Sequence, residues 1–232
     1  MRLYAIGDVH GRLDLLRQMH ERINDDLARR PPADWRVIHL GDYIDRGPES
    51  KGVLDRLIAA RDRDPRHVAL MGNHDAGFIE FLRDPDAAGL FARFGGEDTA
   101  RSYGVALDFG SSERFRAGHA ALLRAVPADH IAFLLGLELS VSFGDFFFCH
   151  AGIRPGVALE KQTPDDLVWI REDFLRWTGL HPKVVVHGHT PSARPELRPN
   201  RVNVDTGAFK TGLLTALVLE GDEKSLLFAQ DD

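Results

Sequence analysis

Short apolar runs recur along the chain, and each ends in small or polar residues. Runs rich in branched side chains occupy residues 3–6, 37–40, 68–71 and 184–186. Apolar positions at helical spacing predict helices over residues 13–28, 52–60, 78–82 and 115–125. This alternation is typical of a protein in which helices connect the strands of a sheet.

Two further segments have the pattern of β-hairpins. Residues 137–143 and 146–149 flank Gly144-Asp145, and residues 213–219 and 225–228 flank Gly221-Asp222. We therefore expect an α/β protein in which helices flank two packed sheets, with residues 1–232 forming a single domain. Residues 83–110 show no clear periodicity and contain Phe94-Gly95-Gly96, which predicts a loop-rich insertion.

Composition and charge narrow the classes of function. The chain has 44% hydrophobic and 28% charged residues, as ordinary globular proteins do. Its net charge of -6 argues against a nucleic acid polymer or a membrane surface as partner, because both are bound by clustered Lys and Arg. A lone cysteine, Cys149, suits a reducing compartment, and no targeting segment is visible, so we expect a cytoplasmic protein.

The strongest chemical signal is a set of five short polar clusters, each placed just after an apolar run. They are Asp8-Val9-His10-Gly11, Gly41-Asp42-Tyr43-Ile44-Asp45-Arg46-Gly47, Gly72-Asn73-His74-Asp75, Cys149-His150-Ala151-Gly152 and His187-Gly188-His189-Thr190. Loops that follow strands can converge at one sheet edge. Carboxylate oxygen and imidazole nitrogen suit Mn, Fe or Zn, so the clusters predict a metal site.

In this order and at these separations, the five clusters resemble the motifs of the calcineurin-like metallophosphoesterases. Within that family they are most similar to the small bacterial and phage phosphoprotein phosphatases of the PPP type. The resemblance extends from Gly7 to about Gly207. It implies a four-layer arrangement of helices, two sheets and helices, and a centre of two divalent metal ions, with manganese first and iron or zinc as alternatives.

The resemblance also implies a role for individual residues at the metals. Asp8 and His10 would bind one metal, Asn73, His150 and His189 would bind the other, and Asp42 would bridge the two. Two adjacent cations would activate a water for attack on phosphorus, so that no phosphoenzyme forms.

The implied catalytic and phosphate-binding residues surround these ligands. His74 matches the general acid of the family, and Asp45 matches the carboxylate that orients it. Arg46 and Asn73 would bind the substrate phosphate. A second arginine is expected about twenty residues after His150, where Arg171 is the assignment and Arg154 and Arg176 are nearby alternatives.

Four other polar residues near these motifs have a simpler explanation. His187 and His39 are interpreted as structural histidines. Cys149 follows three phenylalanines in a strand pattern and is expected to be a buried apolar residue without catalysis. Asp205-Thr206-Gly207 resembles a segment near the metal site in bacterial relatives, but a turn between two strands explains it equally well, so Asp205 is left out of the ligand set.

Three functions remain open on the sequence. A serine/threonine protein phosphatase is favoured by Asp45, because the diadenosine tetraphosphatases of the family carry a small residue there. A diadenosine tetraphosphatase or another nucleotide hydrolase is the alternative, since Met71 and Asp75 depart from the eukaryotic phosphatase signature. A catalytically silent binding module is the third. The expected partners are a phosphorylated protein or a small phosphate ester, with no regulatory subunit.

Overall fold

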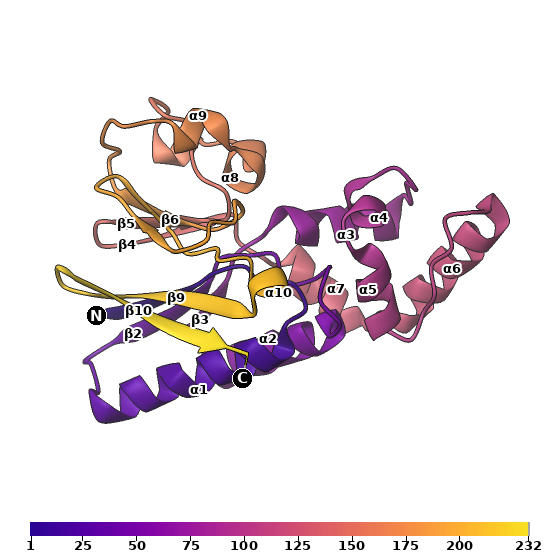
Figure 1. The fold of residues 1–232 in the computed structure, drawn as a ribbon, viewed down its shortest axis with the longest axis horizontal. Coiled ribbons are helices and arrows are strands. Elements are labelled where there is room, and N and C mark those ends of the chain that lie inside the picture. Colours follow the sequence, from indigo (N-terminus) through magenta and orange to yellow (C-terminus); the bar gives the residue numbers. More distant parts are fainter. Residues whose placement is uncertain (232) are drawn as a thin grey trace.

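The computed structural model describes residues 1–231, in which two five-stranded sheets pack against each other (Figure 1). The first sheet has the order β10-β9-β1-β2-β3 and the second β4-β5-β6-β8-β7. The first contains β1 (Arg2–Ile6), β2 (Trp35–His39), β3 (His67–Ala69), β9 (Leu213–Glu220) and β10 (Glu223–Gln230). The second contains β4 (Ser140–Phe143), β5 (Phe146–Cys149), β6 (Val184–His187), β7 (Glu196–Leu197) and β8 (Arg201–Asn203).

Strand β1 is buried on both faces, and its side chains alternate between two apolar cores. Leu3 and Ala5 join the core between the sheets, where they meet Phe148 and Val186 of the second sheet. Tyr4 and Ile6 face the opposite core, under the helices of the first sheet. This explains why residues 3–6 read as one continuous apolar run rather than as an alternating pattern.

Helices cover the two outer faces and complete four layers (Figure 1). Helices α1 (Leu13–Arg29) and α2 (Ser50–Arg63) pack on the first sheet. Helices α8 (Pro164–Trp169) and α9 (Glu172–Leu175) pack on the second. The predicted α/β architecture of two sheets flanked by helices is therefore confirmed.

The remaining helices lie mostly beside the first sheet. They are α3 (Asn73–Arg83), α4 (Leu90–Arg93), α5 (Gly96–Ser102), α6 (Ser112–Ala125), α7 (Ala128–Leu135), the 3₁₀ helix η1 (Leu159–Lys161) and α10 (Ala208–Thr211). Among the helices of residues 1–231, none combines the length and the apolar character that a membrane crossing requires.

The parallel strands explain why the polar clusters meet. Strands β1, β2 and β3 run parallel, and so do β5, β6 and β8 in the other sheet. Each of the five clusters follows the carboxyl end of one of these strands, and Asp205 follows the end of β8. In open sheets of this kind, ligands bind beyond the carboxyl ends of the strands.

Several elements differ from the sequence prediction. The segment 83–110 contains two short helices, α4 and α5, which have too few turns to show a periodic pattern. Helix α7 was missed because its strongly apolar sequence lacks a polar face, and β7 and β8 because they are very short. Helix α3 begins at Asn73 rather than at residue 78, so the third cluster forms its first turn.

Candidate metal centre

Asp42 lies at the centre of the polar clusters. Two groups of side chains are close enough to share a metal ion, His10–Asp42–His74 and Asp42–His150–His189, and Asp42 is common to both. One carboxylate oxygen, Oδ2, lies 3.5 Å from His10 Nε2, and the other, Oδ1, lies 3.5 Å from His150 Nε2. The two oxygens of Asp42 thus face different histidines, as a bridging carboxylate requires.

Three donor atoms, His150 Nε2 among them, converge on one side of Asp42. Asn73 Oδ1 lies 3.0 Å from His150 Nε2 and 2.9 Å from His189 Nδ1, and the two histidine nitrogens are 3.2 Å apart. Ligand atoms bound about 2.1 Å from one metal lie roughly 3.0–3.4 Å from each other. The three atoms already have the spacing of a coordination shell.

The imidazoles are oriented for ligation by their second nitrogen. His10 Nδ1 donates to the carbonyl of Ile44 at 2.7 Å, and His150 Nδ1 donates to that of Leu40 at 2.9 Å. Each Nε2 is therefore left with a lone pair directed at Asp42. Burial lowers the pKa of His10 to about 3 and lowers that of His150, which keeps both rings neutral, as metal ligands must be.

Asp8 lies on the other side of the site, next to a second carboxylate. Asp8 Oδ2 accepts the backbone N–H of His189 at 3.1 Å. Burial, together with the charges of Asp205 and Asp42, raises the pKa of Asp8 well above its usual range. Asp205 Oδ2 is itself buried without a hydrogen-bond partner. Such crowded carboxylates are stable when cations lie between them, so the donor set fits divalent metal ions.

Asp205 is a functional candidate that the sequence prediction left out of the ligand set. A turn explained its sequence context equally well, and the pairing of β8 with β6 is what brings it beside Asp8. Gly188 makes this approach possible, because a Cβ at that position would lie 2.1 Å from Asp8 Oδ1. His187, the structural histidine of the same motif, instead receives a hydrogen bond from Arg201 at 3.3 Å, away from the metal ligands.

The backbone of the site is held in an unfavourable conformation. Five residues other than glycine have a positive φ within residues 1–231, and all five belong to the predicted motifs. They are His10 (45°), Asp42 (54°), Asp45 (68°), Arg46 (69°) and His189 (66°). Left-handed backbone is uncommon for such residues and persists only where surrounding contacts enforce it. The strain is concentrated at the candidate centre.

Asp75 supplies the contacts that hold the Asp42 loop. Its carboxylate accepts the N–H groups of Asp42 (2.8 Å), Tyr43 (3.1 Å) and Gly72 (3.0 Å). Gly72 lies directly under the bridging residue, since a Cβ there would be 2.2 Å from Asp42 Oδ1. From the sequence alone, Asp75 was noted only because it departs from the eukaryotic phosphatase signature. In the structure it positions the backbone of the bridging ligand.

His74 and Asp45 form a hydrogen-bonded pair beside the metal ligands. His74 Nδ1 donates a hydrogen bond to Asp45 Oδ2 at 2.7 Å, and His74 Nε2 accepts one from Arg46 Nη2 at 3.0 Å. Although His74 is close enough to His10 and Asp42 for a metal group, both of its nitrogens are engaged elsewhere. The arrangement suits a proton donor better than a ligand.

The segment 83–110 supports this pair. Thr99 of α5 donates from Oγ1 to Asp45 Oδ1 at 2.7 Å and accepts the Asp45 N–H at 2.8 Å. The carbonyl of Gly95 accepts the N–H of Arg46 at 3.3 Å. The insertion, whose purpose the sequence did not reveal, thus fixes the strained turn that carries Asp45 and Arg46.

Both predicted phosphate-binding arginines lie at the centre. Arg46 stacks its guanidinium 4.6 Å from the Phe209 ring centroid, and Arg171 Nε lies 3.0 Å from His189 Nε2. The two alternatives to Arg171 have other partners. Arg154 pairs with Asp166 and Asp173, and Arg176 pairs with Glu172. The structure thus brings together all ten predicted site residues: Asp8, His10, Asp42, Asp45, Arg46, Asn73, His74, His150, Arg171 and His189.

A comparison with known protein families identifies the family of this chain. The sequence profile of the calcineurin-like phosphoesterases matches residues 1–212. The chain belongs to this family. It is a metallophosphoesterase, and the family uses divalent metal ions.

Individual relatives of the phosphoesterase differ in their substrates. The asymmetrical bis(5′-nucleosyl)-tetraphosphatase PrpE of Geobacillus thermodenitrificans is 28% identical over 94% of this chain and 90% of that protein. A structure of a protein proposed to be a diadenosine tetraphosphatase superimposes with a TM-score of 0.68 at 19% identity, covering 100% of this chain and 95% of that chain. A structure of a cold-active protein tyrosine phosphatase superimposes with a TM-score of 0.63 at 17% identity, covering 97% of this chain and 78% of that chain. At these identities the two superpositions establish the fold alone.

Replacing the bridging carboxylate tests the two-metal arrangement. Asp42→Asn should abolish hydrolysis of every phosphate ester and reduce the bound metal per chain, because an amide bridges two cations poorly. Metal content by elemental analysis and turnover of p-nitrophenyl phosphate measure both effects. Asp62→Asn, on an exposed carboxylate of α2, should change neither. An active, fully metal-loaded Asp42→Asn protein would contradict the bridging role.

Asp75→Asn tests the support of the Asp42 loop. The amide keeps the shape of the side chain but replaces one acceptor oxygen by an NH2 donor, which then faces either the N–H groups of Asp42 and Gly72 or the N–H group of Tyr43. We expect metal affinity and turnover to fall by about 10- to 100-fold, as for other outer-shell partners of metal ligands. Metal titration followed by a rate assay measures the loss. Unchanged affinity in a folded variant would show that Asp75 does not position the ligand.

Proposed function

We propose that this phosphoesterase hydrolyses nucleoside polyphosphates, with dinucleoside tetraphosphates as the leading substrate class. One observation carries the proposal: an aromatic surface lies directly beside the phosphate-binding side chains. Trp169 is 42% exposed, and its ring lies edge-on to His189 with 6.2 Å between centroids. Arg171 follows two residues later and reaches His189.

An open cavity of about 350 Å³ extends from this aromatic surface. It is lined by Trp169, Ile170, Arg171, Arg154 and the acidic side chains of helices α8 and α9, two of which pair with Arg154. Exposed indole rings stack on nucleobases of any type, and carboxylates accept hydrogen bonds from ribose hydroxyl and exocyclic amino groups. A base on Trp169 would leave its phosphate chain next to Arg171 and the metal ligands. The 28% identity to a bis(5′-nucleosyl)-tetraphosphatase supports the same class.

The chain's own residues provide substrate binding and proton transfer. When bound, two divalent cations held by Asp8, His10, Asp42, Asn73, His150 and His189 supply an activated water and neutralise phosphoryl charge. Arg46 and Arg171 approach from two sides of the site, and their guanidinium groups match pairs of phosphoryl oxygens. Asn73 directs its Oδ1 toward His150 and His189, and its amide nitrogen would donate to the same phosphoryl group.

His74 holds the proton for the leaving group. Burial opposes a charged ring, but the carboxylates of Asp42 and Asp45 outweigh it and raise the pKa of His74. Arg46 occupies His74 Nε2 in this structure. A bound phosphoryl group offers Arg46 two oxygens and draws it away, so that Nε2 becomes free to carry a proton toward the leaving oxygen.

A second candidate function is dephosphorylation of phosphoserine or phosphothreonine in proteins. The observation that favours it is the His74–Asp45 pair at 2.7 Å. The alkoxide released from phosphoserine is a strong base and needs a proton, whereas the phosphate group released from a nucleoside polyphosphate needs one far less. The pair is thus more valuable to a phosphomonoesterase.

His74→Asn tests the proton-donor role. Turnover of phosphoserine should fall far more, by about a hundredfold or more, than turnover of p-nitrophenyl phosphate, whose leaving group hardly needs a proton. Steady-state rates on the two substrates, at equal metal loading, give the comparison. Equal losses on both substrates would reject His74 as the general acid.

Trp169→Ala tests the nucleotide-binding surface. Base stacking on an aromatic side chain contributes about 1–3 kcal/mol, so KM for diadenosine tetraphosphate should rise by about 5- to 150-fold. Hydrolysis of p-nitrophenyl phosphate, which has no base, should be unaffected, and Trp169→Phe should retain most of the affinity. If KM for diadenosine tetraphosphate is unchanged in Trp169→Ala, Trp169 does not bind the base and the nucleotide proposal loses its main support.

A direct substrate comparison separates the two functions. With manganese present, the wild-type phosphoesterase should hydrolyse diadenosine tetraphosphate with a higher kcat/KM than either a phosphoserine or a phosphotyrosine peptide. A clear preference for the phosphoserine peptide would overturn the nucleotide proposal and select the second candidate.

A further inference from the structure

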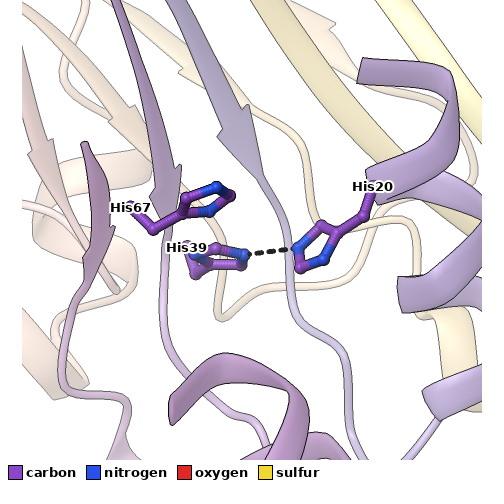
Figure 2. Close-up of side chains that lie close together, drawn as sticks. All are labelled: His20, His39 and His67. Carbon is purple, nitrogen blue, oxygen red and sulfur yellow. Dashed lines mark hydrogen bonds between the residues drawn. The ribbon is translucent and has the colours of Figure 1, made fainter. Parts of the chain in front are cut away.

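Three histidines outside the catalytic centre meet on the helix-covered face of the first sheet (Figure 2). His20 comes from α1, His39 ends β2 and His67 begins β3. Their rings lie 5.2 Å (His20–His39), 5.7 Å (His20–His67) and 6.0 Å (His39–His67) apart between centroids. One nitrogen of each ring lies within 4.8 Å of the other two, so the histidine cluster can surround a single metal ion.

The fold places these rings together on rigid elements. Strands β2 and β3 are parallel, with Val37 opposite His67 and His39 opposite Ala69, so both histidines face the same side of the sheet. Helix α1 packs on that side and supplies His20. None of the three ring positions depends on a loop, which favours a preformed site.

Hydrogen bonds orient two of the rings. His39 Nδ1 donates to the carbonyl of Val68 at 3.1 Å, which leaves a lone pair on its Nε2. His20 Nδ1 accepts Arg56 Nε at 3.1 Å, so His20 Nε2 carries the proton that lies between the two rings at 2.9 Å. His67 Nδ1 is buried and has no hydrogen-bond partner. An oriented lone pair and an unpartnered buried nitrogen are both features of a metal site.

The cluster is neutral and is reached from solvent. Burial lowers the pKa of His20 to about 2, that of His39 to about 3 and also that of His67, so all three are uncharged at neutral pH. A cavity of about 180 Å³, lined by His20, His67, Trp35 and Arg56 among others, opens beside them. It offers an entry path and room for a water as fourth ligand.

We propose that His20, His39 and His67 bind one Zn²⁺ through three imidazole nitrogens, at a site separate from the catalytic pair. Nitrogen ligands without a carboxylate select zinc and its late first-row neighbours over manganese or magnesium. Tetrahedral zinc with three histidines and a water is a common arrangement. Because the ligands join α1 to two strands of the sheet, the bound ion links elements that separate on unfolding and therefore stabilises the folded chain.

Arg56 opposes metal binding in a defined way. For His20 Nε2 to ligate zinc, its proton must move to Nδ1, where Arg56 now donates, so no proton is lost but the Arg56 hydrogen bond is broken. The guanidinium charge also repels a cation. Arg56→Gln removes the charge and places an amide oxygen where it can accept the Nδ1 proton, which is the second-shell bond that ligating histidines usually make.

Zinc titration of the full chain and three variants tests the site. The wild type should bind three Zn²⁺ per chain, whereas His67→Asn and His39→Asn should bind two and retain turnover with manganese. Arg56→Gln should bind three, with the affinity of the third at least tenfold higher. His67 is partly exposed, so its variant keeps the test valid if the buried His39 variant fails to fold.

Thermal unfolding gives an independent measurement. When both metal positions of the catalytic centre are already occupied, further Zn²⁺ should raise the Tm of the wild type but not that of His67→Asn. Equal zinc stoichiometry in the wild type and His67→Asn, or weaker zinc binding in Arg56→Gln, would overturn the proposal. Neither result depends on which phosphate ester is the substrate.

Discussion

The burial of the Asp42 carboxylate between histidines is the constraint on which the rest of the site depends. Its two oxygens face His10 and His150, its own backbone is left-handed, and its N–H is held by Asp75. A buried charge of this kind is stable only when opposite charge lies close to it. The carboxyl ends of parallel strands from two sheets must therefore meet at one place, and the four-layer fold brings them there.

The strained backbone around this carboxylate explains why other residues hydrogen-bond to the loops that carry the site. Asp75 fixes the loop of Asp42, and Thr99 with Gly95 fixes the turn of Asp45 and Arg46. The segment 83–110 is thus tied to the catalytic chemistry, although it contributes no ligand. Its helices are a means of keeping an unfavourable backbone conformation in place.

The sequence predicted the residues at the strand ends because five polar clusters occur in one order, each after a continuous apolar run. A single tripeptide such as Asp8-Val9-His10 is common and weak by itself, and the ordered set is what resembles the family. The sequence did not predict Asp205 as a neighbour of Asp8, the role of Asp75, or the contact of Thr99 with Asp45. These depend on pairing between segments far apart in the chain, which local patterns do not encode.

The histidine cluster illustrates the same limit. His39 alone reads as a structural residue, and only the parallel register of β2 with β3 and the packing of α1 bring His67 and His20 to it. The proposed zinc site would give the phosphoesterase a second metal environment on the helix-covered face of the first sheet, whereas the candidate centre lies beyond the carboxyl ends of the strands. One is rich in carboxylates and suits substrate hydrolysis, and the other consists of nitrogen ligands alone and suits a structural ion.

The central claim is that Asp42 bridges two metal ions, and electron paramagnetic resonance of the manganese-reconstituted phosphoesterase tests it most directly. Two Mn²⁺ ions bridged about 3.5–4 Å apart are magnetically coupled. With two equivalents of Mn²⁺ per chain, we expect a broad multiline spectrum of a coupled pair and a loss of the six-line signal of isolated ions. A six-line spectrum with the full intensity of two independent Mn²⁺ ions would contradict the bridged centre.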